Sequence, residues 1–100
     1  MDGFGGTLLE YIEKNGPVNL KNVADESAVD FLIRIAQEFP GEITIVCLAP
    51  LTNLGKAIKK SPEFARNIKN VTLLGGTYLA QGNTDYFCSE FNIFKDPEAA

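Results

Sequence analysis

The clearest pattern in the chain is a helical one between residues 28 and 36. Apolar residues recur there at four-residue steps in two adjacent rows, which is the spacing of an amphipathic helix. We predict that Asp25 caps this helix and that it ends near Phe39, because Pro40 and Gly41 follow. Shorter patterns predict three more helices: residues 7–14, which Asn15-Gly16 ends; a helix after Pro50 with Leu51, Leu54, Ala57 and Ile58 on one face; and one that Ser61-Pro62-Glu63 begins and that runs through Phe64, Ala65 and Ile68.

Two short apolar runs alternate with these helices and predict strands. Residues 43–48 are apolar almost without interruption, which is typical of a strand buried on both faces of a parallel sheet. Residues 71–74 repeat the pattern and lead into Gly75-Gly76. A strand, a helix and a second strand in this order predict a right-handed crossover, and therefore an α/β fold with an open, mostly parallel sheet and flanking helices.

Composition limits the size and the class of the protein. With 100 residues, of which 45% are hydrophobic, the chain can build one modest core. Residues 96–100 have the pattern of a capped first helical turn that is not completed, so we expect residues 1–100 to form a single partial domain, incomplete at both ends. The net charge of −4 and the scattered lysines and arginines argue against a nucleic-acid partner.

The sequence also predicts a cytoplasmic protein without membrane contact. No apolar run approaches the roughly 20 residues of a membrane span, and residues 1–8 lack the features of a signal peptide. Cys47 lies in an apolar run and Cys88 in a polar segment, so we expect both to be reduced, with a disulfide as the alternative. Because the sequence contains no histidine, acid–base chemistry in this chain would fall to carboxylates, Tyr, Cys or Lys.

Candidate chemistry lies after the two predicted strands. In open α/β sheets ligands bind beyond the carboxyl ends of the strands, here residues 48–50 and 74–76. If residues 89–94 are extended, Glu90 and Asn92 point to one face while Phe91 and Ile93 point to the other. A carboxylate beside an amide suits a polyhydroxylated ligand, whose hydroxyls both donate and accept hydrogen bonds.

Each of these features also has a purely structural explanation. Glu90 and Asn92 are equally typical of the polar face of an edge strand, and the double glycine of a tight turn. No glycine-rich phosphate-binding motif is present. The remaining polar residues have simple roles: Thr52 and Asn53 as helix caps, Asp85 as a solvated loop residue and Asp96 as a helix cap.

Taken in order, several segments resemble the nucleoside hydrolases, which cleave the N-glycosidic bond of inosine, uridine and related nucleosides. The ordered set is more specific than any member of it, and the resemblance extends over nearly the whole chain except residues 7–23. The matching segments are DGFGG (2–6), AVDFL (28–32), PGEITIVCLAPLTNL (40–54), SPEFARNIKNVTLLGG (61–76), GN (82–83) and EFNIFKDPEAA (90–100).

The resemblance implies a Rossmann-like sheet and a set of ribose-binding residues. Asn83 and Glu90 would hold the ribose 5′-hydroxyl, and Asn92 would contact the lower ribose hydroxyls. Leu74 stands where many members have a methionine beside the ribose. The backbone carbonyl of Leu48 would be a calcium ligand. The interval between Asn83 and Glu90 is one residue longer than is usual in the family.

The chain also departs from the family pattern. The acidic D-x-D-x-G-x-D-D cluster that binds calcium and supplies the general base in the family is absent, as is the segment that contributes a further aspartate and a histidine acid. Since calcium takes six to eight oxygens, we expect it to be bound in a complete enzyme and not by these residues alone. We therefore expect no catalytic residue in this chain and no hydrolysis by it in isolation.

Three functional hypotheses follow. The first is the central, ribose-binding segment of an enzyme that acts on a small-molecule nucleoside. The second is a truncated, non-catalytic binding or assembly module, whose exposed sheet edges a partner or a second copy of the chain would cover. The third is a two-carboxylate glycosidase that uses Glu90 with Asp85 or Asp96.

Overall fold

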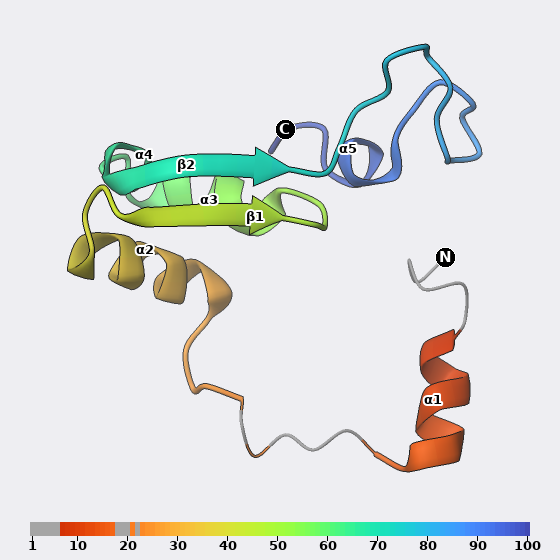
Figure 1. Ribbon diagram of the computed structural model, residues 1–100, viewed down its shortest axis with the longest axis horizontal. Coiled ribbons are helices and arrows are strands. Elements are labelled where there is room, and N and C mark those ends of the chain that lie inside the picture. Colours follow the sequence, from red (N-terminus) through yellow and green to blue (C-terminus); the bar gives the residue numbers. More distant parts are fainter. Residues whose placement is uncertain (1–6, 18–20, 22) are drawn as a thin grey trace.

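The computed structural model describes residues 7–17, 21 and 23–100, and it confirms the α/β class. The turn predicted over residues 2–6 lies outside the described residues. Two parallel strands pack against three helices from the middle of the chain, α2, α3 and α4, while α1 lies apart from them (Figure 1). The elements are α1 (Thr7–Asn15), α2 (Ala28–Glu38), β1 (Ile43–Cys47), α3 (Thr52–Lys60), α4 (Phe64–Asn67), β2 (Ile68–Leu73) and α5 (Phe91–Lys95).

Helix α2 forms where the apolar pattern predicts it, but Asp25 is not its cap. Ser27 occupies the N-cap position, and its hydroxyl oxygen accepts a hydrogen bond from the backbone N–H of Asp30 at 3.1 Å. The Ser27 hydroxyl also donates to the Asp30 carboxylate at 2.8 Å, so a second bond joins the side chains of the N-cap residue and of the third helical residue. The prediction was wrong because Asp25 lies two residues too early to reach the first free N–H groups.

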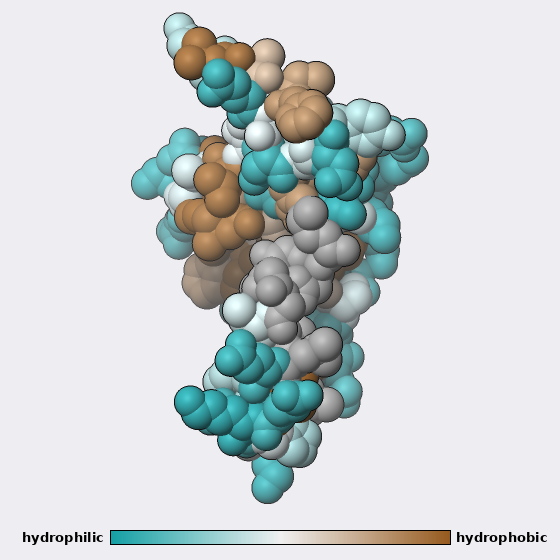
Figure 2. Space-filling model, turned by 90° about the vertical axis from the view of Figure 1, so that its right-hand side faces the viewer, coloured by the Kyte–Doolittle hydropathy of each residue, from teal (hydrophilic) through white to brown (hydrophobic). Residues whose placement is uncertain are grey.

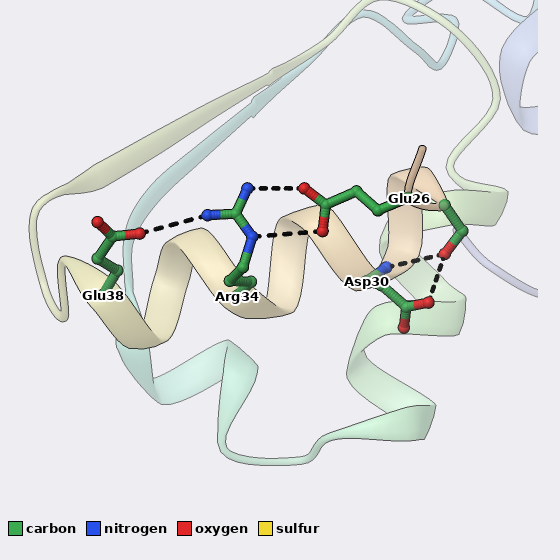
Figure 3. A network of polar contacts seen from close by, with 5 residues as sticks. Glu26, Asp30, Arg34 and Glu38 are labelled. Atoms are coloured by element: carbon green, nitrogen blue, oxygen red, sulfur yellow. Dashed lines mark hydrogen bonds and ion pairs between the residues drawn. The ribbon is translucent and has the colours of Figure 1, made fainter. Parts of the chain in front are cut away.

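Ion pairs along α2 fix its start to the preceding turn and to α3. The Arg34 guanidinium binds Glu26 at 2.7 Å and Glu38 at 3.3 Å (Figure 3). The hydrogen bonds from Arg34 lower the pKa of Glu26. Lys60, in the last turn of α3, binds Asp30 at 2.6 Å. These contacts are exposed, so we expect them to set the register of the two helices more than the stability of the fold.

The two strands pair in parallel, as predicted, but β1 is not buried on both faces. Ile45 pairs with Val71 and Cys47 with Leu73. Burial along β1 alternates, and Val46 is 61% exposed, because α2, α3 and α4 all pack on one face in the described part of the chain. Strand β2 begins at Ile68, so that residue is not helical as predicted, and α4 is a single turn without a side-chain cap from Ser61.

The core lies between the helices and the inner face of the sheet. Ala36 and Ala57 are fully buried and let α2 and α3 approach closely, while Phe64 fills the space beside them. The radius of gyration is 16.3 Å, against about 13 Å for a compact domain of this length. The larger radius reflects the separate position of α1. Both strands end at the same side of the sheet, and their carboxyl ends are open there.

Candidate functional site

The site begins where the two strands end. The backbone N–H of Leu74 donates to the carbonyl of Cys47 at 2.8 Å, which extends the parallel ladder by one step. Leu48 and Leu74 therefore leave the sheet side by side, and their side chains are 70% and 60% exposed. The segments that follow the two strands therefore lie together at the carboxyl end of the sheet.

Glu90 is the N-cap of helix α5, so the prediction that residues 89–94 are extended is wrong. One carboxylate oxygen, Oε1, accepts from the backbone N–H of Asn92 at 3.0 Å. The other, Oε2, accepts from Ile93 at 3.1 Å and from Gly76 at 3.3 Å. These bonds satisfy free N–H groups of the helix, and they also join both ends of the loop between β2 and α5.

The surroundings of Glu90 keep its carboxylate charged. Partial desolvation raises the pKa of Glu90, but the three backbone N–H groups of Asn92, Ile93 and Gly76 together outweigh it, so the net pKa lies below its ordinary value. A carboxylate has about four acceptor positions, and three of them are used. Glu90 therefore retains one acceptor position for a ligand hydroxyl.

Asn92 is buried and is held by the residue that directly follows β2. Its side chain is 7% exposed, and Nδ2 donates to the carbonyl of Leu74 at 2.8 Å. Asn83 approaches from the loop, where its Oδ1 accepts from the backbone N–H of Phe91 at 2.8 Å. The structure thus brings together all four predicted ribose-binding residues: Leu74, Asn83, Glu90 and Asn92.

The two glycines after β2 have different roles. A Cβ at Gly75 would lie 3.0 Å from Cδ1 of Ile93, so this glycine permits the close approach of α5 to the strand tip. Gly76 has a φ of 82°, a conformation that favours glycine, and it turns its N–H toward Glu90. Both are therefore structural requirements of the site.

The loop between Thr77 and Ser89 contains Gly82, which belongs to the GN match, and two residues to which the sequence analysis gave no role, Thr84 and Ser89. A Cβ at Gly82 would overlap the backbone of Ser89, so only glycine fits there. The hydroxyls of Thr84 and Ser89 are in contact, and both donate to the carbonyl of Tyr86 at 2.9 Å. The GN pair was the sequence signal for this loop. At this end of the molecule apolar side chains gather on the upper part of the surface (Figure 2).

The two other carboxylates proposed for glycosidase chemistry have different surroundings. Asp85 is exposed and lines a small pocket of about 140 Å³ with Phe91 and Phe94. Asp96 accepts from the backbone N–H of Ala99 at 3.2 Å, the bond expected of a helix cap, although residues 97–99 form a turn. Asp96 also accepts from the Thr52 hydroxyl at 2.5 Å. Thr52 therefore does not cap α3, whose N-cap is Leu51 without a side-chain hydrogen bond.

Comparison with known proteins decides the family. A family model described as inosine-uridine preferring nucleoside hydrolase matches residues 1–100. The chain belongs to this family. A probable uridine nucleosidase 1 of Oryza sativa subsp. japonica is 40% identical over 99 residues, which cover 99% of the chain and 28% of that relative. Uridine nucleosidase 1 of Arabidopsis thaliana is 43% identical over 84 residues, or 84% of the chain and 25% of that relative.

Solved structures agree with the fold of this nucleoside hydrolase chain. A plant nucleoside hydrolase matches with a TM-score of 0.75 and 45% identity. The match covers 82% of this chain and 25% of the plant enzyme's chain. A purine-preferring ribonucleoside hydrolase from Gardnerella vaginalis matches with a TM-score of 0.72 and 36% identity. This match covers 84% of this chain and 26% of the chain of that hydrolase. The chain spans about a quarter of the length of the relatives that it matches.

The described residues of this nucleoside hydrolase chain contain no cluster of potential metal ligands. Among residues 7–17, 21 and 23–100, no group of three or more His, Cys, Asp or Glu side chains could hold a metal ion. Leu48, which directly follows β1, could contribute at most one carbonyl oxygen, whereas calcium takes six to eight oxygen ligands. Within the same residues, no helix is both long and apolar enough to cross a membrane. Cys47 and Cys88 are both free.

Proposed function

We propose that the protein is a ribonucleoside hydrolase and that this chain supplies its ribose-binding segment. One observation carries the proposal: hydrogen bonds hold Asn83, Glu90 and Asn92 around the start of α5, at the carboxyl ends of two parallel strands. Asn83 accepts from the backbone N–H of Phe91, Glu90 accepts from that of Asn92, and the Asn92 side chain donates to the Leu74 carbonyl. Ligands bind at this place in open α/β sheets. Family membership supports cleavage of the bond between ribose and base, and the relatives that the chain resembles include uridine nucleosidases and a purine-preferring hydrolase.

The free donors and acceptors of these side chains match the chemistry of ribose hydroxyls. Glu90 retains an acceptor position, and the Asn83 Nδ2 has no hydrogen bond within the described part of the chain. Asn92 uses one N–H for Leu74, so its second N–H and its Oδ1 remain for a ligand. A hydroxyl that both donates and accepts can therefore be satisfied between Glu90 and either amide.

These contacts would favour the transition state more than the bound nucleoside. Breaking the bond between ribose and base develops positive charge on the sugar, and hydrogen bonds to its hydroxyls strengthen as that charge grows. Glu90 adds a fixed negative charge because its lowered pKa keeps it ionised. We propose that the backbone carbonyl of Leu48 is one ligand of calcium in a complete enzyme. For the other site residues we propose only that they bind the ribose.

Binding to ribose and nucleosides tests the proposal. We expect D-ribose and uridine to shift the amide NMR signals of Gly76 and Ile93, which are bonded to Glu90. Glu90→Gln should weaken binding by about tenfold or more, since a hydrogen bond to a charged group is worth roughly 1.5–3 kcal/mol. The matched control is Asp85→Asn, which makes the same change at an exposed carboxylate without a hydrogen bond in the described residues, and it should bind within about twofold of the wild type.

The outcomes separate the hypotheses. If the amide signals of the wild-type chain do not respond to ribose or uridine at any concentration, the proposal is refuted. An equal loss in Asp85→Asn would instead favour the two-carboxylate glycosidase. We expect no release of base from inosine or uridine by the 100-residue chain, and measurable calcium-dependent release would contradict that expectation.

A second candidate function is a binding or assembly module, and the bare sheet face favours it. Val46 and Leu74 are both more than half exposed on the face that no described helix covers. A concentration-dependent increase in mass by analytical ultracentrifugation, without any response to ribose, would support this function over the first.

A further inference from the structure

We propose that the contact between Thr52 and Asp96 positions helix α5 for ribose binding, so that Thr52 is a positioning residue of the site. This inference rests on the proposed function. The two residues are 44 positions apart, and the Thr52 hydroxyl donates to Oδ2 of Asp96 at 2.5 Å in a partly buried place. Neither residue contacts Glu90 or Asn92 by a hydrogen bond in the described part of the chain, so any effect on ribose would pass through the helix.

Helix α5 depends on its attachments because it has only five residues. A helix of this length is not stable by itself in water. Its N-terminal end is attached to β2, since Glu90 binds Gly76 and Asn92 binds Leu74. Its C-terminal end is followed directly by Asp96, which is attached to the first residue of α3.

The second attachment includes further contacts, although the same residues also line a pocket of about 250 Å³. Ala99 donates its backbone N–H to Oδ1 of Asp96 at 3.2 Å, so both carboxylate oxygens of Asp96 are engaged. A Cβ at Gly55 would lie 3.0 Å from the Cβ of Ala99. A glycine inside a helix costs about 1 kcal/mol relative to alanine, and the close approach of Ala99 is what this glycine permits. Thr52, Gly55, Asp96 and Ala99 thus form one contact surface between α3 and the turn after α5.

The two attachments connect α5 to both strand tips. Thr52 lies five positions after the end of β1, and Leu74 follows β2 directly. If the Thr52 hydroxyl is removed, α5 keeps only its N-terminal attachment, and its C-terminal end is free to tilt or fray. In a helix of five residues that motion reaches Ile93 and Asn92, so it would weaken their bonds to Glu90 and Leu74, and the hydroxyl-binding groups would no longer be held in one geometry.

Three threonine variants test the inference. Thr52→Val removes the hydroxyl and keeps the shape, and Thr52→Ser keeps the hydroxyl. The matched control is Thr44→Val, the same change at an exposed threonine of β1 whose hydroxyl has no hydrogen bond in the described residues. The measurements on the 100-residue chain are the Kd for D-ribose, the melting temperature, and the hydrogen-exchange rates of the Gly76 and Ile93 amides.

We expect Thr52→Val to bind ribose about tenfold more weakly and to exchange the Ile93 amide about tenfold faster, the change that corresponds to losing one hydrogen bond to a charged group. Thr52→Ser should restore both values, and Thr44→Val should change neither. If Thr52 has a purely structural role, Thr52→Val will have a lower melting temperature, but its ribose affinity and amide exchange will stay at wild-type values at temperatures where it is folded. That result overturns the inference. Failure of Thr52→Ser to restore the ribose affinity and the exchange rate also overturns it.

The exchange rates keep this test separate from the proposed function. If the wild type binds no ribose, the proposed function fails, whereas faster exchange in Thr52→Val that Thr52→Ser reverses would still support the positioning of α5. If the wild type binds ribose and Thr52→Val binds it equally well, the inference fails and the proposed function stands.

Discussion

Replacing Asn92 by aspartate would put a charge where the structure needs a hydrogen-bond donor. Nδ2 of Asn92 donates to the Leu74 carbonyl at 2.8 Å, and the side chain is only 7% exposed. In Asn92→Asp a carboxylate oxygen would face that carbonyl oxygen. Loss of the donor leaves a partly buried carbonyl unsatisfied, at about 1–3 kcal/mol, and the desolvated charge adds to this cost. We expect a loss of about 3 kcal/mol or more in the free energy of unfolding at pH 7.

The cost should depend on pH in a direction that the contact fixes. Burial and the facing carbonyl both raise the pKa of the introduced carboxyl above its unfolded value of about 3.9. Between the two values the native state binds more protons than the unfolded state, so the stability of the variant falls as pH rises through this window. A protonated carboxyl can donate to Leu74, and the difference from wild type should therefore shrink by roughly 1–2 kcal/mol between pH 7 and pH 4.5.

Urea unfolding followed by circular dichroism at a series of pH values measures this difference. Asn53→Asp is the matched control, because Asn53 is exposed in the first turn of α3, where a negative charge is favourable. It should change stability by no more than about 0.5 kcal/mol at any pH. A cost below about 0.5 kcal/mol for Asn92→Asp at pH 7, or a cost that does not vary with pH, would refute the role assigned to the contact with Leu74.

Three further predictions concern the loop, the charge of the site and the core. Gly82→Ala should cost more than about 2 kcal/mol in thermal unfolding, because the new Cβ would overlap the backbone of Ser89 and force the loop to move. The stability difference between wild type and Glu90→Gln should be largest above pH 4.5 and vanish as pH falls through the lowered pKa of Glu90, which a pH series of urea unfolding would show; a constant difference would contradict it. Phe64→Ala should cost about 3–5 kcal/mol, since Phe64 is 1% exposed, and retention of the wild-type melting temperature would contradict its place in the core.

The regular elements were predictable because their signals are local. The four-residue spacing between Ala28 and Ala36 predicted α2 to within a residue at its C-terminal end, and the apolar run at Ile43 predicted β1 and its parallel partner. Asn15-Gly16 ends α1 as expected, since Gly16 has a φ of 79°. The ordered motifs predicted the family, which the match over residues 1–100 confirms.

The errors arose where a short segment allows two periods. Residues 89–94 alternate polar and apolar side chains, which favours a strand, but six residues are too few to distinguish a strand from one turn of helix. The backbone N–H groups of Asn92 and Ile93 decided the outcome, because Glu90 could satisfy both of them only from the N-cap of a helix. The predicted burial of β1 on both faces failed for a different reason, since burial depends on what packs against a strand.

The sequence by itself determined the α/β order of this nucleoside hydrolase chain, the parallel strands and the identity of the residues at their tips. The tertiary structure decided how those residues act together. Leu74 meets Asn92 across 18 positions and Thr52 meets Asp96 across 44. Local propensity contains no information about such pairs, because the donor and the acceptor come within hydrogen-bonding distance only after strands and helices have packed. For the same reason, the use of Glu90 as a cap that accepts three backbone hydrogen bonds and retains one acceptor position is a property of the fold.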